Sequence, residues 1–313
     1  MNFTISSRVA LILGALILTA CGGGASTTAN DDPPPSATCD PANSATHGEC
    51  GTVLIGLTDA DGDFYNYTVD VTGITLETAN GRVVEVLPTA TRINFAEYVD
   101  VTELVAAVVV PPAVYVSGSI SLDYTDAEVV VEANGAPKDA VVTDLDDVEL
   151  TQTTLDIVLS NRDQLAVTKR RTHFLQLDFD LAASHAVDIV PIPARAASDA
   201  FIVAEVSPVD EKDIRVRGPL LDVDIDAMTY TIAVRPFHDR VSDFGRFTVN
   251  VTDDTEFEVD DEAFMGAEGL RALNAAGQGT PTIAKGTLTT ADRKFTADIV
   301  LAGSSVPGHD RDA

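Results

Sequence analysis

The strongest constraint on the fold is an alternation of apolar and polar residues that begins soon after position 50. Tyr65, Tyr67, Val69 and Val71 occupy odd positions, and polar residues separate them. A period of two places alternate side chains on one face of a strand, so this pattern predicts a half-buried β-strand. After Gly73 the apolar residues shift by one position, which predicts a β-bulge at this glycine.

Further strand signals recur along the chain, and Asn-Gly pairs separate some of them. Asn80-Gly81 and Asn134-Gly135 are strong signals for hairpin turns, because Asn and Gly tolerate a positive φ. Two segments also fit a helix. Residues 95–110 carry apolar side chains at helical spacing, although their many β-branched residues disfavour a helix, and residues 262–275 form the second candidate. The sequence therefore predicts an all-β protein with little helix.

The strand signals fall into two groups of unequal length. Residues 52–205 predict a β-sandwich-like domain, and residues 206–302 predict a smaller β-barrel-like domain with one short helix. The small residues and prolines at 191–198 mark the expected edge of the first domain. Residues 21–51 are rich in Gly, Ser and Pro and predict a flexible tether, and residues 303–313 predict a disordered tail.

Residues 1–20 have the layout of an export signal peptide. One arginine precedes an apolar run at positions 9–18, which is too short to span a bilayer. The run ends in Leu18-Thr19-Ala20-Cys21, which resembles the processing box of bacterial lipoproteins. That resemblance implies cleavage before Cys21 and acylation of its thiol, whereas the alternative is an ordinary cleaved signal with an incidental cysteine. No aspartate follows Cys21, and by resemblance to Gram-negative sorting signals this favours the outer membrane, with the folded part facing the periplasm or the cell surface.

Cys39 and Cys50 are the two cysteines that remain once Cys21 is acylated. In an oxidising compartment they are expected to form a disulfide that clips the end of the tether. A C-x10-C pair without further cysteines is a poor zinc site, so metal binding is the weaker interpretation of this pair.

The chain carries a formal net charge of −29, from 49 acidic and 20 basic residues. Such a surface repels phosphate backbones, so nucleic acid is not expected as a partner. The acidity is interpreted as a diffuse solvated surface, with binding of a divalent cation as the alternative. Asp59, Asp61 and Asp63 carry that alternative, because carboxylates at alternate positions of a turn can converge on calcium. Phe64 stands where an EF-hand requires glycine, and solvated turn aspartates are the competing interpretation.

No pattern of catalytic residues stands out in the sequence. It has neither an HExxH motif nor a Gly-x-Ser-x-Gly turn, and its five histidines are interpreted as surface residues. Carboxylates are so numerous that their spacing does not identify a glycosidase pair. Sugar binding would depend on tyrosines because the chain lacks tryptophan, and the alternation places Tyr65 and Tyr67 in the core.

These observations predict a lipid-anchored cell-envelope protein that is not an enzyme and acts as a binding or structural module. The membrane is the expected partner through the lipid anchor, together with an envelope protein or a surface polysaccharide, and no cofactor is expected. A calcium-dependent adhesin or carbohydrate-binding protein is the first alternative, and an envelope hydrolase is the second.

Four blocks of the first strand group carry a resemblance to a known family. They are residues 57–64, 69–76, 110–122 and 177–184. Over about residues 52–205 they resemble the bacterial family called domain of unknown function 4382, although that family commonly has proline at Asp61 and glycine at Val114. The resemblance implies an all-β, sandwich-like domain of exported proteins without an assigned activity. The strand order in residues 216–302 is similar to domain of unknown function 5666, which implies a small β-barrel.

Overall fold

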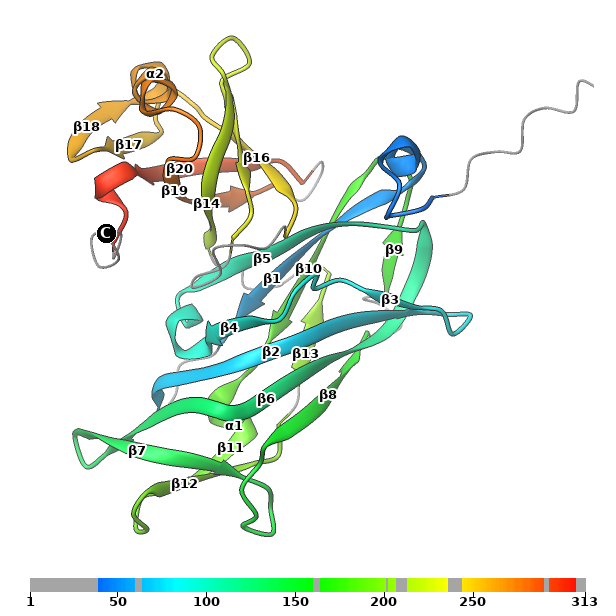
Figure 1. Cartoon of the computed structure of the whole chain (residues 1–313), viewed down its shortest axis with the longest axis vertical. Helices are drawn as coiled ribbons and strands as arrows, with labels where there is room; N and C mark the ends of the chain where they lie inside the picture. The colour runs from blue at the N-terminus through cyan, green and yellow to red at the C-terminus, as the bar shows by residue number, and fades with distance from the viewer. Residues whose placement is uncertain are drawn as a thin grey trace, which may run out of the picture. The chain divides into compact units, whose positions relative to one another are not determined.

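The computed structural model describes residues 39–59, 64–159, 164–200, 202–206, 213–235, 244–289 and 293–307. Contacts between residues divide the chain into two units, Met1–Ser36 and Ala37–Ala313. The second unit is built mostly of strands, with a single helix of more than two turns among its described residues, which confirms the predicted all-β class (Figure 1).

The strands of the described residues are β1 (Gly51–Thr58), β2 (Phe64–Thr78), β3 (Val83–Glu85), β4 (Thr91–Asn94), β5 (Val101–Val110), β6 (Ala113–Ala133), β7 (Ala136–Thr143), β8 (Gln152–Val158), β9 (Leu165–Val167), β10 (Thr172–Asp178), β11 (His185–Asp188), β12 (Ala194–Ser198), β13 (Ile202–Glu205), β14 (Asp213–Asp224), β15 (Thr229–Ala233), β16 (Arg246–Asn250), β17 (Glu256–Val259), β18 (Glu262–Met265), β19 (Pro281–Leu288) and β20 (Phe295–Ala302). The helical elements are η1 (Ser44–Glu49), η2 (Phe95–Tyr98), α1 (Leu181–Ser184), α2 (Gly266–Ala276) and η3 (Gly303–Ser305).

The first thirteen strands form a long curved sheet. Neighbouring strands follow the order β4, β2, β6, β8, β13, β10, β1 and β5, in which β1–β10 and β8–β13 are parallel ladders. The short 3-10 helix η2 connects β4 to β5, the first and last strands of this order. Strands β7, β12 and β11 continue from the far end of β6, as Figure 1 shows.

Strand β2 confirms one prediction from the sequence and contradicts another. The ladder between β2 and β6 shifts its register between Val71 and Gly73, which confirms the bulge. Tyr67 is fully buried as expected, but Tyr65 is 55% exposed. A second register shift, between Phe64 and Asn66, breaks the alternation at Tyr65 and turns its side chain to solvent.

Both Asn-Gly hairpins are confirmed. Asn80-Gly81 lies in the turn that pairs β2 with β3, and Asn134-Gly135 joins β6 to β7. Asn134 and Gly135 have φ angles of 55° and 84°, the left-handed conformation that a type I′ turn requires at both positions.

The helix predicted over residues 95–110 is wrong. Only Phe95–Tyr98 is helical, and the rest forms strand β5, which pairs with β1 along its length. Nearly every side chain of β5 is buried or half-buried. A strand that is buried on both faces is apolar at successive positions, so its pattern also satisfies a helical period.

The strands from β14 onward form a closed ring with a hairpin and a helix attached. Hydrogen-bonded neighbours run β14, β15, β16, β20, β19 and back to β14. The hairpin of β17 and β18 extends from the last half of β20, and α2 packs on β17. The predicted helix over 262–275 is therefore shorter than expected, because Asp260 and Asp261, both with positive φ, form a tight turn that makes residues 262–265 a strand.

Strand β14 also pairs in parallel with β5, so one ladder joins the two strand groups. At this ladder the fully buried Glu103 of β5 accepts hydrogen bonds from the guanidinium groups of Arg215 and Arg217 of β14. The Arg215 guanidinium also lies 5.7 Å from the centre of the Tyr98 ring. A buried carboxylate needs such partners, because desolvation of an unpaired charge is costly.

Candidate functional site

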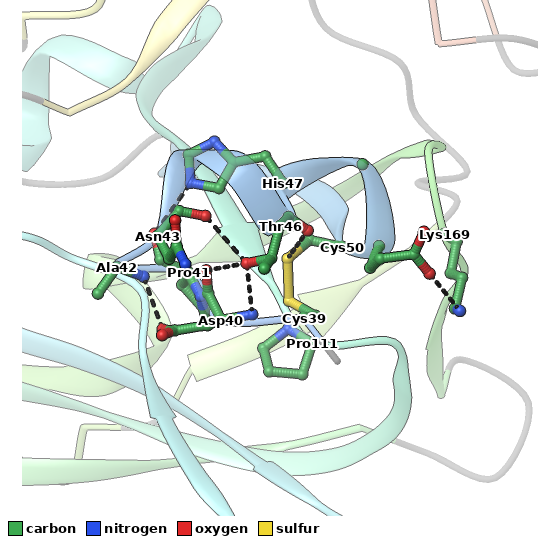
Figure 2. The surroundings of a disulfide bond; sticks show 12 residues. Cys39, Asp40, Pro41, Ala42, Asn43, Thr46, His47, Cys50, Pro111 and Lys169 are labelled. Atoms are coloured by element: carbon green, nitrogen blue, oxygen red, sulfur yellow. Dashed lines mark hydrogen bonds and ion pairs between the residues drawn. A yellow bond between two sulfur atoms is a disulfide. The ribbon is translucent and has the colours of Figure 1, made fainter. Parts of the chain in front are cut away.

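Cys39 and Cys50 form the predicted disulfide, with their Cα atoms 4.9 Å apart (Figure 2). They are separated by 11 positions, and the loop between them contains η1. We call residues 39–50 the clip. The clip ends directly before β1, so it stands between the predicted tether and the first strand of the sheet.

Hydrogen bonds within the clip give it a defined conformation (Figure 2). The Thr46 hydroxyl accepts from the Asp40 N–H at 3.0 Å and donates to the Asp40 carbonyl at 2.9 Å. The Asn43 side chain caps η1 by accepting from the N–H of Ala45, and His47 Nε2 lies 3.0 Å from the Pro41 carbonyl oxygen. These contacts all join residues that are close together in the sequence.

A second set of contacts attaches the clip to the turn between β9 and β10. Arg170 donates its backbone N–H to the Cys50 carbonyl at 2.7 Å and its Nε to the Gly48 carbonyl at 2.9 Å. Lys169 Nζ lies 2.6 Å from a Glu49 carboxylate oxygen, and this hydrogen bond and charge lower the pKa of Glu49. These contacts hold the clip against the folded unit at the start of β1.

Asp59, the one member of the predicted calcium turn that the structure describes, points inward. Its side chain is almost fully buried, and its Oδ1 accepts the N–H of Leu181 at 2.9 Å. Asp61 and Asp63 lie outside the described residues. Across the part of the chain that is described, no group of three or more His, Cys, Asp or Glu residues is placed to hold a metal ion. Cys21 also lies outside the described residues.

The structure reveals a buried polar network that the sequence did not predict. His185, interpreted from sequence as a surface residue, is only 9% exposed. Its Nε2 lies 2.9 Å from the Tyr67 hydroxyl and its Nδ1 lies 3.0 Å from the Leu181 carbonyl oxygen. The Tyr67 hydroxyl is also 3.2 Å from that of Tyr124. The ring of Phe179 packs beside His185, at 5.9 Å between ring centres.

Burial sets the protonation states in this network. Desolvation lowers the pKa of His185 to about 4, against the smaller opposite effect of its hydrogen bond to Leu181. Desolvation also raises the pKa of Tyr67 well above its ordinary value. A neutral imidazole that donates Nδ1–H to the Leu181 carbonyl presents Nε2 as an acceptor for the Tyr67 hydroxyl. The network is thus satisfied internally and links α1 and β11 to β2.

This arrangement suits a structural role better than a catalytic one. A catalytic histidine and its nucleophile must lie where a substrate can reach them, whereas His185 is almost fully buried and Tyr67 is fully buried. The neutral Tyr67 hydroxyl is a weak nucleophile. Sequence signals for this network are absent, because 118 positions separate Tyr67 from His185.

The tyrosines do not form a sugar-stacking platform. Five of the six are buried: Tyr67, Tyr98, Tyr115, Tyr124 and Tyr230. Only Tyr65 exposes its ring to solvent, which corrects the expectation that it lies in the core. Stacking on a sugar ring requires an accessible aromatic face, so the tyrosines offer one such ring rather than a surface.

Comparisons with known proteins add no further identification. A scan against models of protein families matched none of them, and searches of curated proteins and of solved structures found no match. In the described part of the chain, the helices are all too short or too polar to cross a membrane.

Proposed function

We propose that this chain is a lipid-anchored protein of the bacterial outer membrane, and that its folded unit is a non-catalytic binding or structural module. The observation that carries the proposal is Leu18-Thr19-Ala20-Cys21 at the end of an apolar run. Acylation of Cys21 would supply several chains, each worth about 0.8 kcal/mol per buried methylene, and so a firm hold on the bilayer.

The clip supports this proposal because it is where a tether would meet the folded unit. Residues 22–38 are rich in Gly, Ser and Pro and span at most about 60 Å when fully extended. The contacts of Arg170 and Lys169 hold the clip, which the disulfide closes, against the β9–β10 turn. Movement of the tether would then be confined to the residues before Cys39.

The non-catalytic part of the proposal rests on the chemistry of the buried network. His185 and Tyr67 satisfy each other in the interior, where substrate has no access to them. A screen with chromogenic ester, phosphate and glycoside substrates tests this part. Turnover by the full chain that a single carboxylate substitution abolishes would overturn it.

Mass spectrometry and membrane fractionation test the anchor. Protein purified from the membranes of a Gram-negative host is expected to begin at Cys21 and to carry acyl chains on that residue. Cys21→Ser is expected to move the protein into the soluble periplasmic fraction. Cys39→Ser removes a cysteine without touching the processing box, so this control variant should remain in the membrane fraction. An unmodified thiol at Cys21, in protein that is free in solution, would refute the proposal.

A further inference from the structure

The hairpin of β17 and β18, with α2 and β20, encloses a groove on the molecular surface. One hollow of about 380 Å³ lies over the outer faces of β18, β17 and β20. A second hollow of about 840 Å³ lies between the end of the hairpin and α2. Phe264 and Glu268 line both hollows, so the two adjoin, and we call them together the acidic groove. Figure 1 shows these elements gathered on one side of the ring.

Apolar side chains lie on both sides of the acidic groove. Met265 of β18 lies opposite Glu256 of β17, which lies opposite Ile299 of β20. Residues paired across strands share one face of a sheet, so these three side chains form a row. Met265 is 49% exposed and Ile299 is 42% exposed, although both are large apolar side chains. Such a pair leaves apolar surface that a partner can cover.

The lining of the acidic groove is strongly negative. It contains five carboxylates and one guanidinium, from Glu256, Glu258, Asp260, Glu262, Glu268 and Arg271. In the described part of the chain, the structure forms no ion pair with Glu256, Glu258 or Glu268. Glu256 and Glu258 belong to β17, which lies between β18 and β20. The residues that pair with them on these two strands are apolar.

We propose that the acidic groove docks a basic amphipathic segment of a partner protein. Lysine or arginine side chains of that segment pair with the groove carboxylates, and its large apolar side chains cover Met265 and Ile299. This inference rests on the proposed function, since it names the kind of partner that the binding module takes. A second copy of the chain does not fit, because its net charge of −29 repels an acidic surface.

The carboxylates and the exposed apolar side chains of the groove contribute to different properties of the complex. Charge complementarity steers the approach of a basic segment and rejects acidic ones. Burial of the exposed methionine and isoleucine side chains supplies affinity that salt does not screen. A simple cation would use only the carboxylates and would leave the apolar flanks uncovered.

Fluorescence anisotropy with a labelled peptide of alternating lysine and leucine tests the proposal at physiological salt. The protein is the full chain carrying Cys21→Ser, which cannot be acylated at that position. The double variant Glu256→Gln/Glu268→Gln is expected to weaken binding by about tenfold, or about 1.4 kcal/mol. Met265→Ser is expected to weaken binding of the same peptide. The salt dependence of binding should stay the same in this variant, because no charge is removed.

The matched control is Asp222→Asn/Asp226→Asn, which removes two exposed carboxylates outside the groove. It should bind the peptide as the parent does. Equal weakening by both double variants would show attraction to net charge alone and overturn the proposal. So would equal affinity for a peptide with serine in place of leucine, or no binding by the folded parent chain. Membrane fractionation tests the anchor separately, so either proposal can fail alone.

Discussion

At the scale of single residues, burial gives His185 a role that its sequence context does not suggest. The imidazole accepts and donates within a cage of aromatic rings, and solvent reaches little of it. Its ionisation is therefore coupled to folding. Any proton that binds the imidazole must either break the Tyr67 contact or place a charge among apolar side chains.

The free energy of unfolding is expected to fall as pH drops from about 6.5 to about 4. The pKa of His185 is about 4 in the folded protein and near 6.5 in an unfolded chain, so the unfolded chain binds more protons in this window. Full protonation of the unfolded imidazole would cost about 3 kcal/mol of stability. In His185→Gln, the free energy of unfolding measured with denaturant should depend less on pH between these values, because the contribution of His185 is removed while the other titrating groups are unchanged. Identical slopes in the two proteins would contradict the coupling.

At the scale of secondary-structure elements, the contacts that matter most join segments far apart in sequence. The β5–β14 ladder carries a buried carboxylate against two guanidinium groups. The clip carries a disulfide against the β9–β10 turn. Each contact can be removed by substitution of the side chains that form it.

Replacing Glu103 with glutamine is expected to lower the free energy of unfolding by about 3 to 5 kcal/mol, because the change removes a fully buried charge that hydrogen-bonds Arg215 and Arg217. Chemical denaturation at neutral pH measures the effect. Asp70→Asn provides the control, since Asp70 pairs with Arg92 near the surface, where an ion pair contributes at most about 1 kcal/mol. Equal losses in both variants would mean that Glu103 is not held by its buried partners.

Replacing both Cys39 and Cys50 with serine is expected to cost about 3 kcal/mol, because the short loop gains conformational freedom in the unfolded chain. Thermal unfolding in the presence and absence of a thiol reductant measures this effect. Reductant should lower the melting temperature of the wild-type protein and leave that of the double variant unchanged. A melting temperature that is insensitive to both treatments would show that the clip adds no stability.

At the scale of the whole molecule, the net charge of −29 opposes compaction. Acidic side chains outnumber basic ones by more than two to one, so most carboxylates have no cation to pair with. Salt screens the resulting repulsion over distances of about 10 Å at 0.1 M. The folded unit is therefore expected to become more stable as ionic strength rises, because salt screens the repulsion between its carboxylates.

The melting temperature is expected to rise when sodium chloride is increased from about 0.02 to about 0.3 M. Differential scanning calorimetry at neutral pH gives the measurement. A variant that combines Asp222→Asn, Asp226→Asn, Glu256→Gln and Glu258→Gln should gain less from the same salt, because it has less repulsion to screen. A fall in melting temperature with salt would mean that ion pairs outweigh repulsion.

Features encoded by neighbouring residues were predicted from the sequence. The bulge at Gly73, the Asn134-Gly135 hairpin and the strand-rich class all follow from local spacing and from the backbone freedom of Gly and Asn. The disulfide followed from counting cysteines. The errors arose where distant packing decides the outcome. Strand β5 looked helical because it is buried on both faces, and Tyr65 looked buried because its register shift depends on β6.

The sequence by itself determined the all-β class, the main turns, the disulfide and the lipoprotein-like motif that carries the proposed function, because each is expressed in residues close together along the chain. Only the tertiary structure decided which strands are neighbours, that Asp59 and His185 are satisfied in the interior, and that Met265, Glu256 and Ile299 share one exposed face. Those outcomes depend on partners from distant segments, and burial and hydrogen-bond satisfaction take effect only when the chain has brought them together.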